Sequence, residues 1–289
     1  EVVGSRFGKD YDPLITVRDE SGHIVVQRDN DPGLFYDCRF AHTFESSGRF
    51  IVEVRDARYE GNEAWHYVLR MGDFPAAIVA IPSVVQPGNT GTFWLPEVSA
   101  ERFALTVPGR PRLQSFNQEI RASASGMATW IPLQSTALTE HSLESEPNDD
   151  PDETATMAVV PGTLSGVLDT PGDRDCFAFY LTKGQTLDFT GVSRDIGSAA
   201  DLELVMYAPG APDAREVRRI DEVPLRVGNR TIQLEARFSY PANVDGLHWL
   251  MVSDLVRDGG PSFSYRIDVT QQEPALILAA DVSRLTVPQ

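Results

Sequence analysis

The sequence predicts an all-β protein, and three observations carry this prediction. Short runs rich in Val, Ile and aromatic residues recur along the chain, for example DPLITVRD (12–19) and RFIVEVRD (49–56). Turn signals such as ESGH, NDPG and SSGR bound these runs. No segment shows the periodicity of a long amphipathic helix. We therefore expect strands throughout, connected by turns.

The run 49–56 shows the strand pattern most clearly. Phe50, Val52 and Val54 lie at alternate positions and so share one face of a strand, while Glu53 and Arg55 lie on the other face. We expect the face with Phe50, Val52 and Val54 to be buried.

The chain also repeats itself. Residues 48–71 align with 246–269 at a constant offset of 198 residues, without a gap. The identical pairs are Gly48/Gly246, Val54/Val252, Asp56/Asp254, Gly61/Gly259 and Tyr67/Tyr265. Upstream, 5–17 resembles 193–205 with one gap, which pairs Asp12 with Asp201, and Leu14 with Leu202 or Leu204. The identical aspartates and glycines are interpreted as loop caps and turns, and the tyrosines as core residues.

The two copies have unequal lengths. About fifty residues, starting at the acidic run, precede SRDIGS (193–198), whereas four precede SRFG (5–8). The chain also starts directly in a strand-like segment, without the pattern of a signal peptide. We therefore expect a fragment or processed product, in which the first strands of copy one lie outside these residues or come from another chain.

Four regions follow from this reading. Residues 1–73 are the C-terminal part of a first β-sandwich, 74–142 a small immunoglobulin-like β domain, 143–272 a complete sandwich, and 273–289 the start of a further β domain or a tail.

Composition narrows the class of partner and the compartment. The formal net charge of −17 disfavours nucleic acid as a partner, because such binding needs a basic face. No apolar run is long enough for a membrane-spanning helix. Cys38 and Cys176 are far apart in sequence and form either buried free thiols or one inter-domain disulfide. This composition suits a secreted, periplasmic or cell-surface protein.

Residues 144–271 contain a set of motifs: the opening ESEPND (144–149), the segment GDRDCF (172–177), the turn KGQ (183–185), the segment GSAADLEL (197–204) and the closing strands DGLHWLMVSD and YRIDV. With these motifs, the segment resembles the bacterial pre-peptidase C-terminal domain family. Two departures are His248, where the closing strand usually has Tyr, and RRIDEV (218–223), where an Asp-Asp pair is usual. Residues 1–72 resemble the second half of the same domain. The layout is similar to large secreted planctomycete-type proteins.

The resemblance implies tandem jelly-roll-like β-sandwiches, appended to secreted peptidases and other exported proteins and not catalytic themselves. Related collagen-binding modules of clostridial collagenases bind calcium through the acidic N-terminal segment and hold collagen on one sandwich face.

The acidic run suggests a calcium site. Calcium takes six to eight oxygen ligands, mostly carboxylates and carbonyls. The predicted ligands are Glu144, Glu146, Asn148, Asp149, Asp173 and Asp175. The alternative is a solvated inter-domain linker, which is what most acidic runs are.

We expect no enzymatic activity. The five histidines include no HExxH spacing, and no GxSxG or phosphate-binding loop is present. Two non-catalytic roles remain. One is a binding module for an extracellular protein or polysaccharide, with Tyr59, Trp65, Trp249 and Phe263 as aromatic anchors. The other is a scaffold that joins domains of the same assembly in the cell envelope, stiffened by calcium. A further alternative is the accessory C-terminal region of a secreted peptidase or other exported enzyme.

Overall fold

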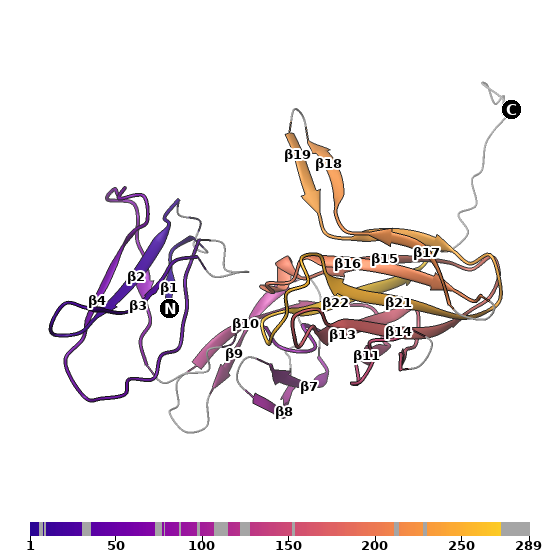
Figure 1. Ribbon diagram of the computed structural model, residues 1–289, viewed down its shortest axis with the longest axis horizontal. Helices are drawn as coiled ribbons and strands as arrows, with labels where there is room; N and C mark the ends of the chain where they lie inside the picture. Colours follow the sequence, from indigo (N-terminus) through magenta and orange to yellow (C-terminus); the bar gives the residue numbers. More distant parts are fainter. Residues whose placement is uncertain are drawn as a thin grey trace, which may run out of the picture.

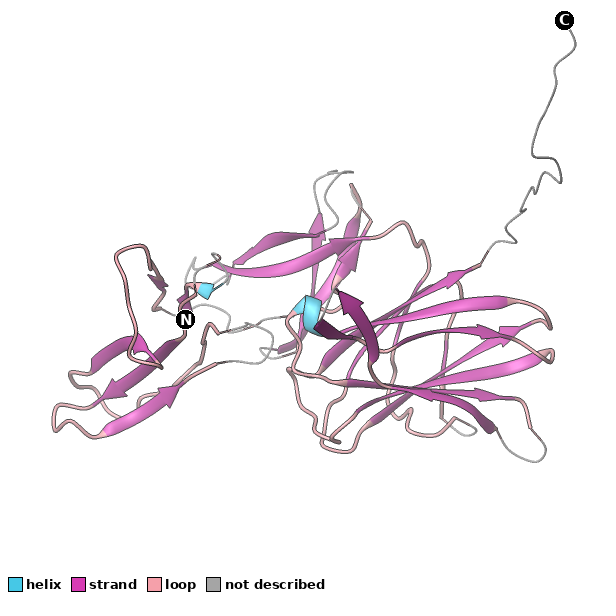
Figure 2. Cartoon of the chain, turned by 90° about the horizontal axis from the view of Figure 1, so that it is seen from above, coloured by secondary structure: helices cyan, strands magenta, loops and turns pink. Residues whose placement is uncertain are grey.

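The computed structural model describes residues 1–5, 8, 10–30, 36–72, 77, 79–86, 88–96, 99–106, 115–121, 128–151, 154–210, 214–227 and 230–272. Strands make up nearly all of the regular structure in these residues, which confirms the predicted all-β class (Figure 2). An N-terminal unit lies at one end of the molecule, strands β7 to β10 lie in the centre, and a larger sandwich lies at the other end (Figure 1). No helix in the described part of the chain is long and apolar enough to cross a membrane.

The C-terminal sandwich consists of two five-stranded sheets. The first has the order β11-β13-β22-β15-β20 and the second the order β12-β14-β21-β16-β17. The strands of the first sheet are β11 (His141–Leu143), β13 (Gly162–Val167), β15 (Thr186–Val192), β20 (Arg237–Pro241) and β22 (Ser264–Gln271). Those of the second are β12 (Thr156–Met157), β14 (Arg174–Leu181), β16 (Leu202–Ala208), β17 (Arg215–Ile220) and β21 (Gly246–Asp254).

Side chains from both sheets form one core. Phe177, Phe179 and Leu181 project inward from alternate positions of β14 and are fully buried. They meet Leu164 and Tyr265 of the opposite sheet in the largest apolar cluster of the described residues. Each such side chain contributes on the order of 1.5–3 kcal/mol by leaving water. A hairpin of β18 (Val223–Val227) and β19 (Arg230–Leu234) projects away from this sandwich (Figure 1).

The middle region has two small sheets. One has the order β6-β10-β9, and the other pairs β7 with β8. Their strands are β6 (Val84–Val85), β7 (Thr90–Leu95), β8 (Ser99–Thr106), β9 (Ser115–Arg121) and β10 (Ala128–Ser135). The region packs directly on the C-terminal sandwich, because Val79 and Ile81 share a buried cluster with Val167, Val192 and Ile196.

The N-terminal unit repeats only part of the sandwich. It has a sheet of order β3-β2-β4 and a pair β1-β5. Its strands are β1 (Val2–Val3), β2 (Pro13–Arg18), β3 (Ile24–Arg28), β4 (Ile51–Asp56) and β5 (Val68–Leu69). The face of β4 that we expected to be buried is only partly covered, since Val52 is 37% exposed. Cys38 and Cys176 are both buried and neither is in a disulfide, so in the described part of the chain no such bond joins the two copies.

Hydrogen bonds show that the two copies of the repeat also share the same local structure. Asp56 and Asp254 each accept three backbone N–H groups, two from their own loop and one from the residue directly before the paired strand, β2 or β16. Three residues after each aspartate, Tyr59 and Arg257 both adopt a left-handed backbone conformation with a φ of 60°. The interpretation of these aspartates as loop caps is therefore confirmed.

The upstream alignment requires one correction. Asp37 accepts from the N–H groups of Gly4 and Ser5, just as Glu235 accepts from those of Ser193 and Arg194. Gly4, not Ser5, therefore occupies the position of Ser193, and no gap is needed. Leu14 pairs with Arg55 as Glu203 pairs with Ser253, so Leu14 corresponds to neither Leu202 nor Leu204.

Candidate cation site

The acidic run enters the sandwich beside β13. Strand β11 pairs in parallel with β13, and the Glu144 N–H extends this ladder by donating to the Ser165 carbonyl (3.0 Å). Glu144 therefore lies at the end of β11 with its side chain toward the sandwich core. Pairing of β11 with β13 fixes the position at which the acidic run meets the sandwich. The residues after Glu144 then cross the edge of this sheet.

Three carboxylates converge at this point. Carboxylate oxygens of Glu144, Glu146 and Asp175 all lie within 4.8 Å of one another. Asp175 comes from β14 of the opposite sheet and is fully buried, Glu144 is partly buried, and Glu146 is exposed. The cluster therefore extends from the buried carboxylate of Asp175 to the solvent-exposed carboxylate of Glu146.

The hydrogen bonds of the cluster leave one oxygen without an N–H donor. Glu144 Oε1 accepts from the Val167 N–H (2.6 Å), and the Tyr265 hydroxyl lies 3.4 Å from Glu144 Oε2. With the Asn148 amide oriented so that its nitrogen faces β14, it donates to Asp175 Oδ1 (3.0 Å). Asp175 Oδ2 is buried and accepts no hydrogen bond from an N–H group, and the Asp175 side chain interacts instead with the Glu144 carboxyl group and the Tyr265 hydroxyl. A buried carboxylate oxygen in this state is costly unless a proton or a cation satisfies it.

The pKa shifts of the three carboxyl groups also indicate that their charges are not balanced within the protein. Burial is the largest influence on Glu144 and raises its pKa to about 7, although the Val167 hydrogen bond acts in the opposite direction. Burial, and then the neighbouring Glu144 carboxylate, raises the pKa of Asp175 well above its ordinary range. Burial and the charge of Asp173 also raise the pKa of Glu146. No described Lys or Arg forms an ion pair with this group, so the two buried carboxylates share a proton or require a cation.

A glycine leaves the space for the cluster. A Cβ atom at Gly166 of β13 would lie 2.3 Å from the Tyr265 hydroxyl and 2.4 Å from Glu144 Oε2. Any larger residue would therefore displace the Glu144 carboxylate. Tyr265, Gly166 and Val167 shape the site, and sequence reasoning assigned none of them to it.

The remaining predicted ligands lie around the cluster. Asn148 is buried and supports Asp175 through its amide, and its carbonyl accepts from the Cys176 N–H. Asp173 accepts from the N–H groups of Asp169 (2.5 Å) and Arg174 (2.8 Å), which closes the turn before β14. Asp149 is exposed. Asp169, which was not predicted, raises the pKa of both glutamates through its charge.

The chemistry of these donors fits a hard cation. All three carboxylates offer oxygen, and no described Cys or His joins the group. Oxygen-only donors suit calcium, magnesium or manganese rather than zinc or copper. The unequal burial of the three carboxylates and the exposure of Glu146 to solvent suit calcium. This ion tolerates irregular coordination geometry and completes its coordination shell with water.

The predicted aromatic anchors do not form one exposed surface. Trp249 is only 9% exposed, Trp65 packs into the core of the N-terminal unit, and Phe263 packs against the core of the sandwich. Tyr59 alone of the four is highly exposed (80%), with the Arg55 guanidinium 4.1 Å from its ring centroid. Strand alternation and loop packing turned the other three inward, which the sequence could not specify.

No protein-family model matches the sequence, and no curated protein matches it. Among solved structures, PliG from Aeromonas hydrophila, a periplasmic inhibitor of g-type lysozyme, aligns with a TM-score of 0.30 at 14% identity over 46% of this chain and 99% of its own. The pre-peptidase C-terminal domain of collagenase from Bacillus anthracis aligns with a TM-score of 0.28 at 20% identity over 43% of this chain and 100% of its own. PliG from Salmonella Typhimurium aligns with a TM-score of 0.25 at 16% identity over 46% of this chain and 98% of its own.

The tandem arrangement and the planctomycete-type context stay predictions.

Proposed function

We propose that the chain is a non-catalytic scaffold region of an exported protein, in which calcium stiffens the joint between the middle region and the C-terminal sandwich. One observation carries this proposal. The fully buried Asp175 carboxylate has an oxygen that accepts no N–H group, and that carboxylate faces the carboxylates of Glu144 and Glu146. A cation held by these three residues would neutralise them and satisfy that oxygen.

The position of the cluster links it to the joint. Leu143, next to Glu144, packs on the buried cluster that contains Val79 and Ile81 of the middle region. Val167, whose N–H donates to Glu144, belongs to the same cluster. Fixing Glu144 with a cation therefore also fixes the residues on which the middle region rests. A metal that binds only the folded protein stabilises it by mass action.

Thermal unfolding of the full chain in millimolar calcium and in chelator tests the proposal. We expect calcium to raise the unfolding midpoint of the wild type, and Glu144→Gln and Asp175→Asn to lose this response. Asp149→Asn is the matched control, since Asp149 lies in the same acidic run but outside the cluster, and it should respond like the wild type. An unchanged calcium response in both Glu144→Gln and Asp175→Asn would refute the site.

A further inference from the structure

Two carboxylates of the N-terminal unit lie close together where β2 begins and β3 ends. Asp12 directly precedes β2, while Asp29 and Asn30 directly follow β3, which pairs with β2. One terminal atom of the Asn30 amide lies 2.8 Å from Asp12 Oδ1, 3.1 Å from Asp29 Oδ1 and 3.1 Å from the Tyr36 carbonyl oxygen. Three oxygens from different parts of the chain therefore converge on one point.

The Asn30 amide alone does not satisfy these oxygens. With its nitrogen toward them it offers two N–H groups to three acceptors, and it carries no charge. Burial, and then the charge of Asp29, raises the pKa of Asp12. Arg58 lies nearby, but its ion pairs are with other acids of the unit. Among the described residues, no Lys or Arg therefore forms an ion pair with either carboxylate.

Strand registers give the equivalent residues in the second copy of the repeat. Strand β2 pairs with β3 and β4 as β16 pairs with β17 and β21, and the pair Ile15–Arg28 lies at the level of Leu204–Ile220. Upstream, the position of Ser5 is that of a residue whose backbone N–H also donates to an acidic side chain. The equivalent pairs are Asp12/Asp201, Asp29/Asp221, Asn30/Glu222 and Ser5/Arg194.

The second copy has a positively charged group at the equivalent point. Arg194 Nη2 donates to Asp201 Oδ1 (2.8 Å) and to Glu222 Oε1 (2.8 Å), and so lies between the two carboxylates. The first copy keeps oxygen-bearing side chains at both acceptor positions but has Ser5 in place of the arginine. It therefore retains the acceptors of a cation and lacks the side chain that supplies the cation in the second copy.

We propose that Asp12, Asp29, Asn30 and the Tyr36 carbonyl bind a calcium ion where the second copy holds the Arg194 guanidinium. The Asn30 amide then turns its oxygen toward the ion, which gives four oxygen ligands. Its separations of 2.8 Å and 3.1 Å from the other three oxygens suit such a shell, because neighbouring ligands of calcium are about 3 Å apart. Water completes the shell, since Asp29 and Asn30 are exposed.

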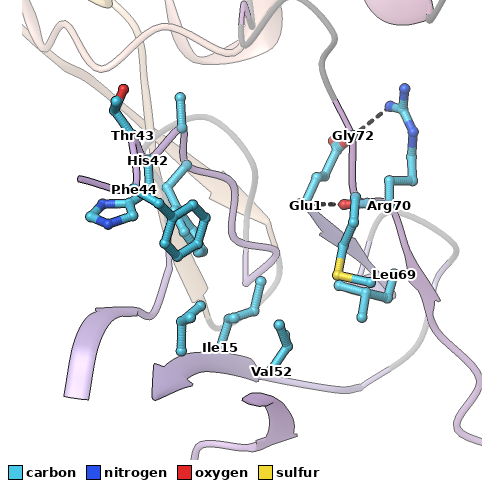
Figure 3. Close-up of a pocket in the computed structure, with 13 residues that line it drawn as sticks. Glu1, Ile15, His42, Thr43, Phe44, Val52, Leu69, Arg70 and Gly72 are labelled. Carbon is cyan, nitrogen blue, oxygen red and sulfur yellow. Dashed lines mark hydrogen bonds and ion pairs between the residues drawn. The ribbon is translucent and has the colours of Figure 1, made fainter. Parts of the chain in front are cut away.

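This site is separate from the cluster of Glu144, Glu146 and Asp175, which belongs to the C-terminal sandwich, and neither site requires the other. The N-terminal unit also has a cavity of about 470 Å³, which is a poorer place for a cation (Figure 3). Most of its lining is apolar, and the Glu1 carboxylate in it pairs with Arg70 at 2.6 Å.

Equilibrium dialysis against calcium at physiological ionic strength tests the proposal. The full chain with Asp175→Asn, which disables the cluster in the sandwich, should still bind one calcium ion. In this background, Asp12→Asn or Asp29→Asn should weaken binding by at least about tenfold, because each removes a charged ligand. Glu20→Gln is the matched control, since Glu20 is an exposed acid beyond the other end of β2, and it should leave binding unchanged.

The second copy also provides a variant that fills the site. Ser5→Arg combined with Asn30→Glu reproduces the pair Arg194 and Glu222, so this double variant should fold, as checked by circular dichroism, and lose the calcium ion. Asn30→Glu alone should keep it.

Three results would overturn the proposal. They are no calcium bound by the Asp175→Asn chain, unchanged binding in both the Asp12→Asn and Asp29→Asn variants, and binding by the folded double variant equal to that of its parent. One ion bound by both the wild type and the Asp175→Asn chain, and lost with Asp29→Asn, would support this site and refute the cluster in the sandwich.

Discussion

The carboxylates of Glu144 and Asp175 are buried side by side, and this pair sets the chemistry of the candidate site. We predict that Glu144→Gln stabilises the cation-free protein by on the order of 1–2 kcal/mol at pH 8. The amide oxygen can still accept from Val167, and the new N–H₂ group can donate to Asp175 Oδ2. Urea unfolding in chelator measures this difference, and a less stable variant would contradict the prediction.

The same comparison should depend on pH. The folded-state pKa of Glu144, about 7, lies above its ordinary value of 4.5, so the folded wild type binds more protons than the unfolded chain between these limits. Stability from this group is therefore complete below about pH 4.5 and falls as pH rises to about 7. Gln does not titrate, so its advantage should be small at pH 5 and largest above pH 7. A constant difference across this range would show that Glu144 stays ionised.

At the residue scale, the sequence predicted the acids of the site better than their roles. The acidic run and GDRD contain Glu144, Glu146 and Asp175, which the structure brings together. The role of Asn148 as a donor to Asp175 depends on strand β14 lying opposite, and no local pattern encodes that. Tyr265 was interpreted as a core or strand-corner residue, and its complete burial confirms the core position, but the sequence did not predict its hydroxyl beside Glu144.

At the scale of single strands, β13 makes room for the site through one glycine. We predict that Gly166→Ala destabilises the sandwich by about 1–3 kcal/mol and removes the calcium response, since its Cβ would overlap the Tyr265 hydroxyl and Glu144 Oε2. Gly61→Ala is the control, because no atom lies within 4 Å of the added Cβ. Chemical unfolding with and without calcium measures both effects. A Gly166→Ala protein that still responds to calcium would place the cation elsewhere.

The loops after β4 and β21 depend on one aspartate each. We predict that Asp254→Ala lowers the stability of the C-terminal sandwich by about 2–3 kcal/mol, because it leaves the N–H groups of Asp201, Val256 and Asp258 without their acceptor. Asp254→Asn keeps one acceptor oxygen and should lose less. Equal losses in both variants would indicate that the charge, rather than the hydrogen bonds, matters.

The repeat shows how far the sequence defines these elements. Asp56 and Asp254 were predicted as caps from identity alone, and the structure confirms this. Asp37 and Glu235 are also acidic and lie at the same spacing, but their shared role went unnoticed because the surrounding residues differ. The one-residue error at Leu14 arose because matching Ser5 to Ser193 gave more identities than the correct register.

At the scale of the whole molecule, the joint is held by packing as well as by the proposed cation. Val79 and Ile81 are buried against Val167, Val192 and Ile196. Arg266 of β22 also donates to Gln134 Oε1 of β10 (2.5 Å) and to Ser83 Oγ (3.4 Å). The middle region and the C-terminal sandwich should therefore unfold together even without calcium, and the domain boundary that the sequence suggested near residue 142 is not a free hinge.

Scanning calorimetry can test this coupling with Ile81→Ser. Ile81 is fully buried in the cluster between the two regions, so the polar replacement should remove the apolar contact and cost about 2–5 kcal/mol at the joint. We expect one transition in the wild type and two in the variant, with the upper one at the wild-type midpoint of the sandwich. Val85→Ser is the control, because Val85 lies in the separate core of the middle region and contacts Phe93 and Leu133 there. It should weaken the middle region without separating the transitions. A single transition in Ile81→Ser would mean that Arg266 and the cation suffice to hold the joint, and the calorimetric profile of Ile81→Ser in chelator would then separate these two contributions.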